Sequence, residues 1–145
     1  MGKFTTNIEI EASPEKVFAY GISDTMNDVW KEWYEAKWTS EGPVRVGSMA
    51  HFIGNPNFLK GEWDSEVTEF VKNEKMVLRN MGATKGTSSM GFEPTTKGTM
   101  VTFYMDYELP YSVLGKLIDK LKVNKDMKKM GKKLLENLKK AIEVK

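Results

Sequence analysis

The chain has 145 residues, of which 40% are hydrophobic and 29% are charged, and its formal net charge is +2. This length suits one domain with one core, and this composition excludes a disordered or fibrous protein. The chain contains no cysteine, which excludes disulfides, thiolate metal ligands and thiol nucleophiles. We therefore expect a single domain over residues 1–145.

The N-terminal part of the chain predicts one strand followed by two short helices. Between Phe4 and Ala12, apolar and polar residues alternate with the period of a half-buried strand. Ser13 then places a capping hydroxyl before Pro14, which suits the first position of a helix. A second helix is predicted to open at Ser23. Its apolar residues recur at helical spacing: Met26, Val29, Trp30 and Trp33.

The middle of the chain consists of short runs separated by turn residues, which indicates an antiparallel sheet. We predict six strands here: Glu35–Ser40, Ser48–Ile53, Gly61–Phe70, Met76–Met81, Gly86–Glu93 and Gly98–Leu109. The last strand has the clearest alternation. Its apolar residues fall on one face, and its polar residues, including Asp106 and Glu108, fall on the other.

After Pro110 the apolar period becomes helical, in two stripes. The first comprises Val113, Leu114, Leu117, Ile118 and Leu121. The second comprises Met127, Met130, Leu134, Leu138, Ala141 and Ile142. A bend or short break is predicted between them at Val123 and Asn124. The second stripe spans about five turns and needs a broad apolar partner, for which the preceding sheet is the only candidate.

Four stretches of the chain resemble the START-like (SRPBCC) superfamily, in particular its polyketide cyclase/dehydrase and coenzyme Q-binding branch. They are IEIEASPEKVFAY (Ile8–Tyr20), GPVRVGS (Gly42–Ser48), GEWDSEVTEF (Gly61–Phe70) and EPTTKGTMVTFYMDYELP (Glu93–Pro110). The resemblance covers nearly the whole chain. It implies an α+β helix-grip fold, in which a curved seven-stranded antiparallel sheet, two short helices and a long C-terminal helix enclose an apolar cavity. It does not choose among the activities of the superfamily.

Few residues suggest catalysis. The only histidine, His51, stands in a predicted strand without an orienting partner that the sequence reveals. Carboxylates with metal-ligand spacing, a GxSxG motif, a P-loop and a dinucleotide-binding glycine pattern are all missing, so we expect no metal and no cofactor. A pocket acid or base, or a group that polarises a carbonyl, would have to come from ordinary strand residues: Asp64, Arg79, Tyr104, Asp106 and Glu108.

The apolar side chains are more informative, because the chain has ten methionines, four tryptophans, seven phenylalanines and five tyrosines. Flexible methionines and rigid rings suit a tolerant pocket, although they also fill a core between a curved sheet and a helix. Gly131 indicates either a close backbone approach or room for a ligand. We predict that the ligand-binding residues are Trp63, Met90, Phe92, Val101, Phe103, Met105, Met127, Met130 and Leu134.

Three functions remain open. The first is binding or carriage of a small hydrophobic molecule such as a lipid, isoprenoid, quinone or polyketide-like aromatic. The second is a cyclase, aromatase or dehydrase that uses a pocket acid or base. The third is a surface for anionic membrane or an acidic partner, because residues 111–145 carry a net charge of +7 against −5 for the remainder.

The sequence also bears on partners and location. The nearly balanced overall charge, without a recognition motif, argues against nucleic acid as a partner. We find neither the apolar core of a signal peptide nor a run approaching the roughly 20 apolar residues of a membrane span. A cytoplasmic location is the resulting expectation, and the sequence leaves the oligomeric state open.

Overall fold

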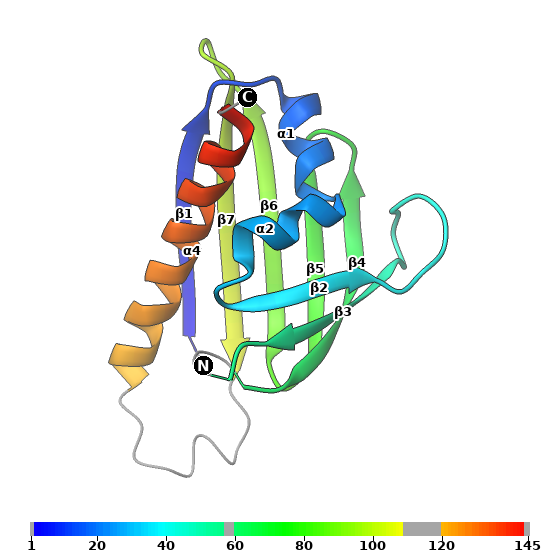
Figure 1. The fold of residues 1–145 in the computed structure, drawn as a ribbon, viewed down its shortest axis with the longest axis vertical. Helices are drawn as coiled ribbons and strands as arrows, with labels where there is room; N and C mark the ends of the chain where they lie inside the picture. The colour runs from blue at the N-terminus through cyan, green and yellow to red at the C-terminus, as the bar shows by residue number, and fades with distance from the viewer. Residues whose placement is uncertain (1, 57–59, 109–119, 144–145) are drawn as a thin grey trace.

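A seven-stranded antiparallel sheet forms the body of the protein (Figure 1), and the computed structural model describes residues 2–56, 60–108 and 120–143. Across the sheet the strands run in the order β1-β7-β6-β5-β4-β3-β2. Their bounds are β1 Gly2–Ile10, β2 Tyr34–Trp38, β3 Met49–Gly54, β4 Glu62–Val71, β5 Lys75–Gly82, β6 Lys85–Pro94 and β7 Thr99–Glu108. Because β1 pairs with β7, the first and last strands of the chain lie side by side, and β1 forms one edge of the sheet.

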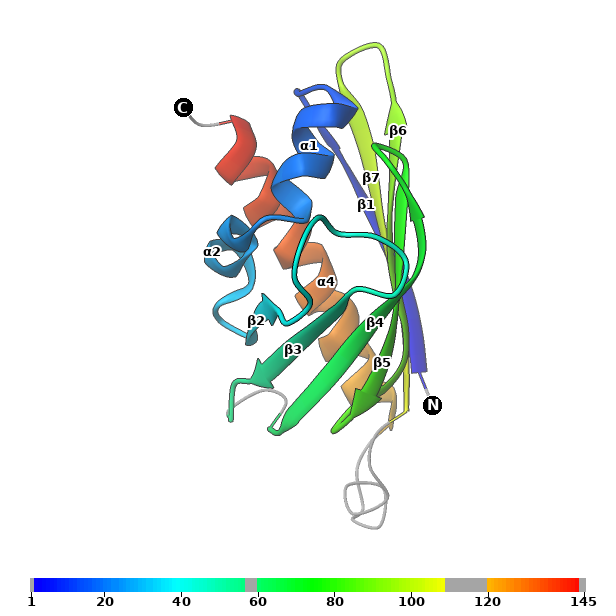
Figure 2. The same cartoon turned by 90° about the vertical axis from the view of Figure 1, so that its right-hand side faces the viewer.

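The helices of the described residues lie on one side of the sheet, toward which the strands β2 to β4 curl (Figure 2). They are α1 (Pro14–Gly21), the 3₁₀ turn η1 (Asp24–Met26), the single turn α2 (Asn27–Trp30) and the long α4 (Lys120–Glu143). Ser13 caps α1 as its sequence predicts, since its Oγ accepts a hydrogen bond from the amide of Lys16 at 3.3 Å. The curved sheet with helices on its concave face confirms the predicted helix-grip fold.

Side-chain alternation along the strands agrees with the prediction. In β7, every second side chain from Thr99 to Tyr107 is buried, whereas Asp106 and Glu108 face the other way. In β1, Phe4 and Ile10 are buried in the same manner. Each inward face therefore contributes to one core between the sheet and the helices.

The second predicted helix is shorter than its pattern suggests. Trp33 stands outside it, in the turn between α2 and β2. The side chain of Asn27, at the start of α2, bonds the backbone of Ala36 in β2, which brings the chain back into the sheet directly after one helical turn. A tertiary contact thus overrides the helical spacing of the apolar residues.

The long helix corrects two predictions. No break occurs at Val123 and Asn124, because α4 runs through both; the helix penalty of these residues is only about 0.5 kcal/mol each, and Asn124 accepts a hydrogen bond from the Tyr107 hydroxyl at 2.8 Å. Ala141, predicted in the apolar stripe, is exposed, and Leu135 is buried instead. The first predicted stripe, Val113 to Ile118, lies outside the described residues, as does the side chain of Leu121.

Candidate functional site

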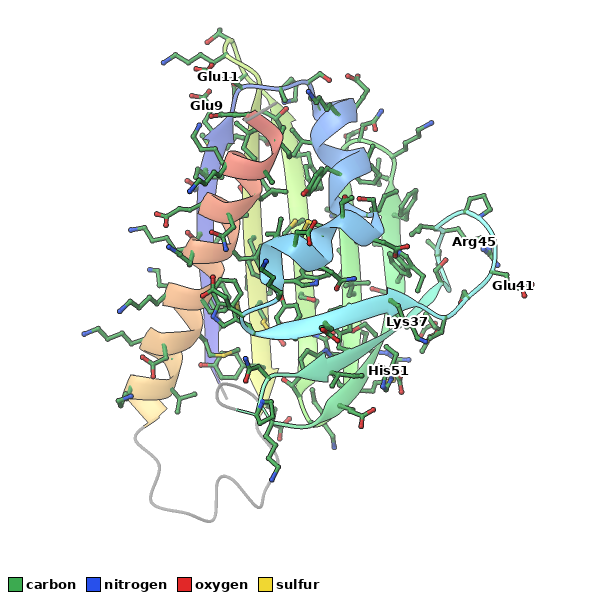
Figure 3. The ribbon with its side chains drawn as sticks, in the orientation of Figure 1. Glu9, Glu11, Lys37, Glu41, Arg45 and His51 are labelled. Atoms are coloured by element: carbon green, nitrogen blue, oxygen red, sulfur yellow. The ribbon has the colours of Figure 1, made fainter. Side chains whose placement is uncertain are left out.

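A cavity of about 100 Å³ lies between the concave face of the sheet and the helices. Side chains from α1 to β2 line one side of it, side chains from β3 to β7 line the sheet side, and Leu134 of α4 contributes from the long helix. The exposed side chains of Asp24 and Lys37 also belong to the lining, so the cavity reaches the surface between η1 and β2. Figure 3 shows Lys37 on β2.

One side of the cavity is an aromatic wall, made of Trp30, Tyr34, Phe52 and Trp63. The rings of Phe52 and Trp63 stack with their centroids 5.2 Å apart, because β3 and β4 place these residues directly opposite each other. Tyr34 meets Phe52 edge-on, and Trp30 lies tilted against Tyr34 with a centroid separation of 5.1 Å. These mutual contacts hold the four rings in a fixed arrangement, which gives the cavity a rigid wall against which apolar molecules can pack.

The rest of the lining is more adaptable. Four methionines line the cavity: Met26, Met76, Met90 and Met105. Leu78, Phe103 and Leu134 add further apolar side chains to this lining. A methionine side chain is unbranched, with three rotatable bonds, and can change rotamer at little cost to its packing. The cavity therefore combines a fixed aromatic wall with side chains that can adjust its shape.

A small polar group interrupts this apolar lining on the sheet. Asn80 of β5 is 5% exposed and lines the cavity together with Ser88 of β6. The Asn80 Oδ1 accepts a hydrogen bond from the Oγ of Ser65, which is fully buried on β4, at 2.5 Å. The Asn80 amide nitrogen lies 3.4 Å from the Ser88 Oγ. Buried polar side chains of this kind fix the orientation of a ligand in an otherwise apolar pocket.

Hydrogen bonds also hold the rim of the cavity. The Asn27 Oδ1 accepts from the Ala36 amide at 2.9 Å and from the Trp30 indole at 2.8 Å, while its Nδ2 donates to the Ala36 carbonyl at 2.9 Å. On the same side, the Trp38 indole donates to the Ile22 carbonyl at 2.9 Å. These bonds attach β2, which is an edge strand, to α2 and to Ile22, the residue after α1.

The nine residues predicted to bind ligand divide into two groups. Five of them line the cavity: Trp63, Met90, Phe103, Met105 and Leu134. The other four are buried in the core outside this lining: Phe92, Val101, Met127 and Met130. The strand register explains two of these four, because Phe92 pairs with Val101 two residues along from Met90 and Phe103, toward α1, whereas Met127 and Met130 lie on α4.

The candidate acids and bases lie elsewhere. His51 and Asp64 point away from the core on β3 and β4, where the His51 Nδ1 lies 2.8 Å from the Asp64 carboxylate and its Nε2 lies 2.7 Å from the Glu62 carboxylate. Hydrogen bonds to Asp64 and then to Glu62 raise the pKa of His51 above its ordinary value. Figure 3 shows His51 on β3, the strand that pairs with β2 and its Lys37. The histidine thus has orienting partners, but it does not face the cavity.

Other titratable strand residues, like His51, pair with neighbouring side chains and do not face the cavity. The Tyr104 hydroxyl donates to Asp106 at 2.9 Å, which raises the pKa of Tyr104, and the same carboxylate accepts from the Thr87 amide. Arg79 pairs with Glu66 at 2.7 Å. Within the cavity the perturbed group is Tyr34, whose pKa is raised by burial, so its hydroxyl stays protonated.

Sequence reasoning missed most of the aromatic wall and the polar group. Phe52 carried a usable signal, since it occupies an alternate position of the predicted strand Ser48–Ile53, whereas Tyr34 lies one residue before the predicted strand Glu35–Ser40. Their inward direction depends on register, which the sequence alone does not give. Asn80 carried no signal, because an asparagine in a strand looks like a solvent-facing residue until Ser65 is placed beside it.

The described residues form neither a metal-ligand cluster nor a membrane-crossing helix. No group of three or more histidine, aspartate or glutamate side chains is placed to hold a metal ion in residues 2–56, 60–108 and 120–143. Within the same ranges, none of the helices has the length and apolarity that a membrane crossing requires.

Solved structures with this fold are numerous. A protein from Thermus thermophilus is 21% identical, with a TM-score of 0.81 over 97% of this chain and 96% of that one. A protein from Chromobacterium violaceum is 16% identical, with a TM-score of 0.72 over the full length of both chains. The Aha1 dimer from Colwellia psychrerythraea is 24% identical, with a TM-score of 0.66 over 99% and 98%. At these identities the likeness shows the fold.

A comparison with curated protein sequences gives no match. A family model described as polyketide cyclase/dehydrase and lipid transport matches residues 1–143. This match confirms the resemblance seen in the four stretches of sequence. The chain belongs to the polyketide cyclase/dehydrase and lipid transport family.

Proposed function

We propose that this protein binds a small, mostly apolar molecule in the cavity between the sheet and the helices. The observation that carries the proposal is the cavity itself, with its aromatic wall and its four methionines. Membership in a family of cyclases and lipid transport proteins supports it, because that family implies a hydrophobic small molecule as ligand. Candidates are a lipid, an isoprenoid, a quinone or a polyketide-like aromatic.

The size of the cavity sets a condition on this binding. A volume of about 100 Å³ is smaller than the roughly 300–1,000 Å³ of pockets that hold drug-sized ligands. A larger ligand would have to displace side chains, and Met76 and Met90, which are half-buried in the lining, are the most readily moved. We therefore propose that the cavity widens around its ligand.

Apolar burial can supply the binding free energy. A ligand that loses about 200 Å² of apolar surface to this lining gains about 5 kcal/mol at 25 cal/mol per Å², before the cost of association is subtracted. Tight binding therefore does not need many polar contacts.

The lining favours binding over acid–base catalysis. Among the described residues, its carboxylate is that of Asp24, exposed at the rim, and its other charged group is Lys37, also exposed. Tyr34 retains its proton inside, and His51 lies on the outer face of the sheet. A cyclase or dehydrase would need a proton-transferring group beside the substrate. Among the described lining residues, Tyr34 is the one buried titratable group that could transfer a proton.

Filling the cavity tests the proposal. Ala50 is buried in the lining, so Ala50→Leu places additional carbon atoms in the empty volume. We expect this variant to lose the fluorescence enhancement of N-phenyl-1-naphthylamine that the unmodified protein gives. The matched control is Ala19→Leu, which adds the same atoms on the exposed face of α1. No enhancement with the unmodified protein, or equal enhancement by all three proteins, would contradict the proposal.

A second candidate function rests on a different surface. Five exposed lysines form a cationic strip on α4: Lys125, Lys128, Lys129, Lys132 and Lys133. They fall within nine helical residues, a length of about 12 Å. Asp126, the acidic residue inside this segment, pairs with Lys122 at 3.1 Å. We propose that the cationic strip contacts anionic lipid, to which each lysine contributes about 1 kcal/mol.

Vesicle binding tests this second function. We expect the protein to sediment with vesicles containing phosphatidylserine and not with pure phosphatidylcholine vesicles, and added salt should weaken the binding. The triple variant Lys128→Gln, Lys129→Gln and Lys132→Gln should bind about 100-fold more weakly.

The control for this experiment neutralises the same number of charges elsewhere. It carries Lys72→Gln, Lys85→Gln and Lys97→Gln, three exposed lysines outside α4. Equal losses in the two triple variants would attribute the binding to net charge and reject the cationic strip as the contact surface.

A further inference from the structure

The polar group in the cavity has unused hydrogen-bonding capacity. Asn80 is nearly fully buried among apolar lining residues, with Leu78 and Met76 on the same face of β5. Burying an amide is costly unless both its oxygen and its nitrogen find partners. The partners of Asn80 therefore indicate what the cavity is prepared to accept.

The oxygen of this amide is satisfied by the protein. Ser65 lies directly opposite Asn80 in the ladder between β4 and β5, and its hydroxyl donates to the Asn80 Oδ1 at 2.5 Å. This bond orients the side chain, because it assigns the oxygen to the Ser65 side. The amide NH₂ of Asn80 therefore faces the hydroxyl of Ser88.

The nitrogen is only partly satisfied. An amide NH₂ carries two N–H donors, and the described residues offer it one acceptor, the Ser88 Oγ at 3.4 Å. That distance is longer than the 2.7–3.2 Å of ordinary N–H···O bonds. Asn80 and Ser88 both line the cavity, so this donor capacity is available to a molecule inside it.

Tyr34 adds a second donor in the same cavity. Its ring belongs to the aromatic wall, and its hydroxyl makes no hydrogen bond to the described residues. Burial keeps this hydroxyl protonated. The interior therefore offers N–H and O–H donors, whereas the charged groups Asp24 and Lys37 lie at the exposed rim.

We propose that the ligand carries a neutral carbonyl oxygen, as an aromatic or alicyclic ketone does, and that this oxygen accepts a hydrogen bond from the Asn80 amide. The proposal rests on the binding function proposed above and adds the chemical class of the ligand. A carboxylate fits less well, because a buried anion needs a cationic partner and the described lining has one cation, Lys37, at the surface.

Two probes of the same shape test the ligand class. Acetophenone and α-methylstyrene differ only in that the ketone oxygen of the first is a methylene group in the second. The measured quantity is the ratio of their dissociation constants, Kd of α-methylstyrene over Kd of acetophenone, obtained by ligand-observed NMR. The two probes also differ in hydrophobicity, but this difference enters the ratio of every protein equally. It therefore cancels when the ratio of a variant is compared with that of the unmodified protein.

The variant that removes the amide must not leave its partner unsatisfied. We therefore use Ser65→Ala with Asn80→Leu, because replacing both partners of a buried hydrogen bond by apolar groups is nearly neutral for stability. The ratio should fall about three- to tenfold in this double variant. Leu135→Met, a volume-conserving change in the core outside the lining, should keep the ratio of the unmodified protein.

A spectroscopic measurement on the unmodified protein does not depend on any variant folding. The infrared C=O stretch of bound, ¹³C-labelled acetophenone should lie below its frequency in an alkane, because a hydrogen bond to the oxygen weakens the C=O bond. A stretch at the alkane frequency, or an unchanged ratio in the double variant, would overturn the carbonyl proposal and leave the cavity function intact. Failure of both probes to bind the unmodified protein would overturn both.

Discussion

The ring of Phe4 occupies the space that a side chain on Gly131 would need. A Cβ atom at position 131 would lie 2.3 Å from the Cε1 of Phe4 and 3.3 Å from the Cδ2 of Phe103. These two rings meet edge-on, with centroids 5.5 Å apart, at the place where α4 crosses β1 and β7. Of the two explanations that the sequence left open for this glycine, close backbone approach is the one that the geometry supports.

Gly131→Ala should therefore destabilise the protein. Alanine improves helix propensity by about 1 kcal/mol, but displacing a packed aromatic ring costs about 1–3 kcal/mol. We expect a net loss of about 1 kcal/mol in the free energy of unfolding, measured by urea denaturation. Gly91→Ala is the control, because a Cβ there meets nothing within 4 Å. If Gly131→Ala were stabilising, the close approach would not constrain this position.

The pKa of His51 should respond to its two carboxylate partners unequally. Asp64 is the larger cause of the increase and Glu62 the smaller. We expect Asp64→Asn to lower the pKa of His51 more than Glu62→Gln does. Since the chain contains one histidine, its imidazole proton signals can be followed directly through an NMR titration. An equal effect of the two variants would contradict the ranking.

The same shift predicts how stability depends on pH. The pKa of His51 in the folded protein lies above the 6.5 of the unfolded chain, so protonation favours the folded state. This contribution is fully present below pH 6.5 and is lost as the pH rises through the folded pKa. The free energy of unfolding should therefore decrease as the pH rises from 6.5 through the folded pKa of His51. His51→Gln should make this decrease smaller, as measured by urea denaturation at a series of pH values.

Much of the fold could be predicted because the strands are half-buried. Alternation in β7 places Val101, Phe103 and Met105 on one face without any knowledge of the partner strands. The continuity of α4 could not be predicted, since the partner of the Asn124 side chain is the hydroxyl of Tyr107, 17 residues away. Local propensity is a weak guide wherever such a contact exists.

The site was predictable only in part, for a related reason. Trp63 and Met105 follow from alternation and apolar character. Tyr34 and Phe52 require the register of β2 against β3 and β4 before their rings can be brought together. Asn80 requires a specific neighbour, Ser65, to be recognised as a buried residue. Long-range pairing, rather than residue type, is the missing information in these cases.

Asn27 should be important for the rim of the cavity. Its side chain makes three hydrogen bonds, two to the backbone of Ala36 and one to the indole of Trp30. Asn27→Ala leaves these partly buried groups without partners, which should cost about 2–4 kcal/mol of stability. Amide exchange at Ala36 should also accelerate. The control Asn7→Ala, at an exposed position of β1, should have little effect on either quantity.

Leu134 and Leu138 provide a matched pair that separates packing from ligand binding. Both are fully buried on α4, but the lining of the cavity includes Leu134 alone of the two. Replacing either by alanine should cost about 2–5 kcal/mol, since each change leaves a void in the core. Leu134→Ala should in addition enlarge the cavity, so this variant should bind a larger apolar probe such as pyrene more tightly than the unmodified protein does. Leu138→Ala should lose stability without this gain, and equal pyrene affinities in the two variants would show that Leu134 does not border the bound ligand.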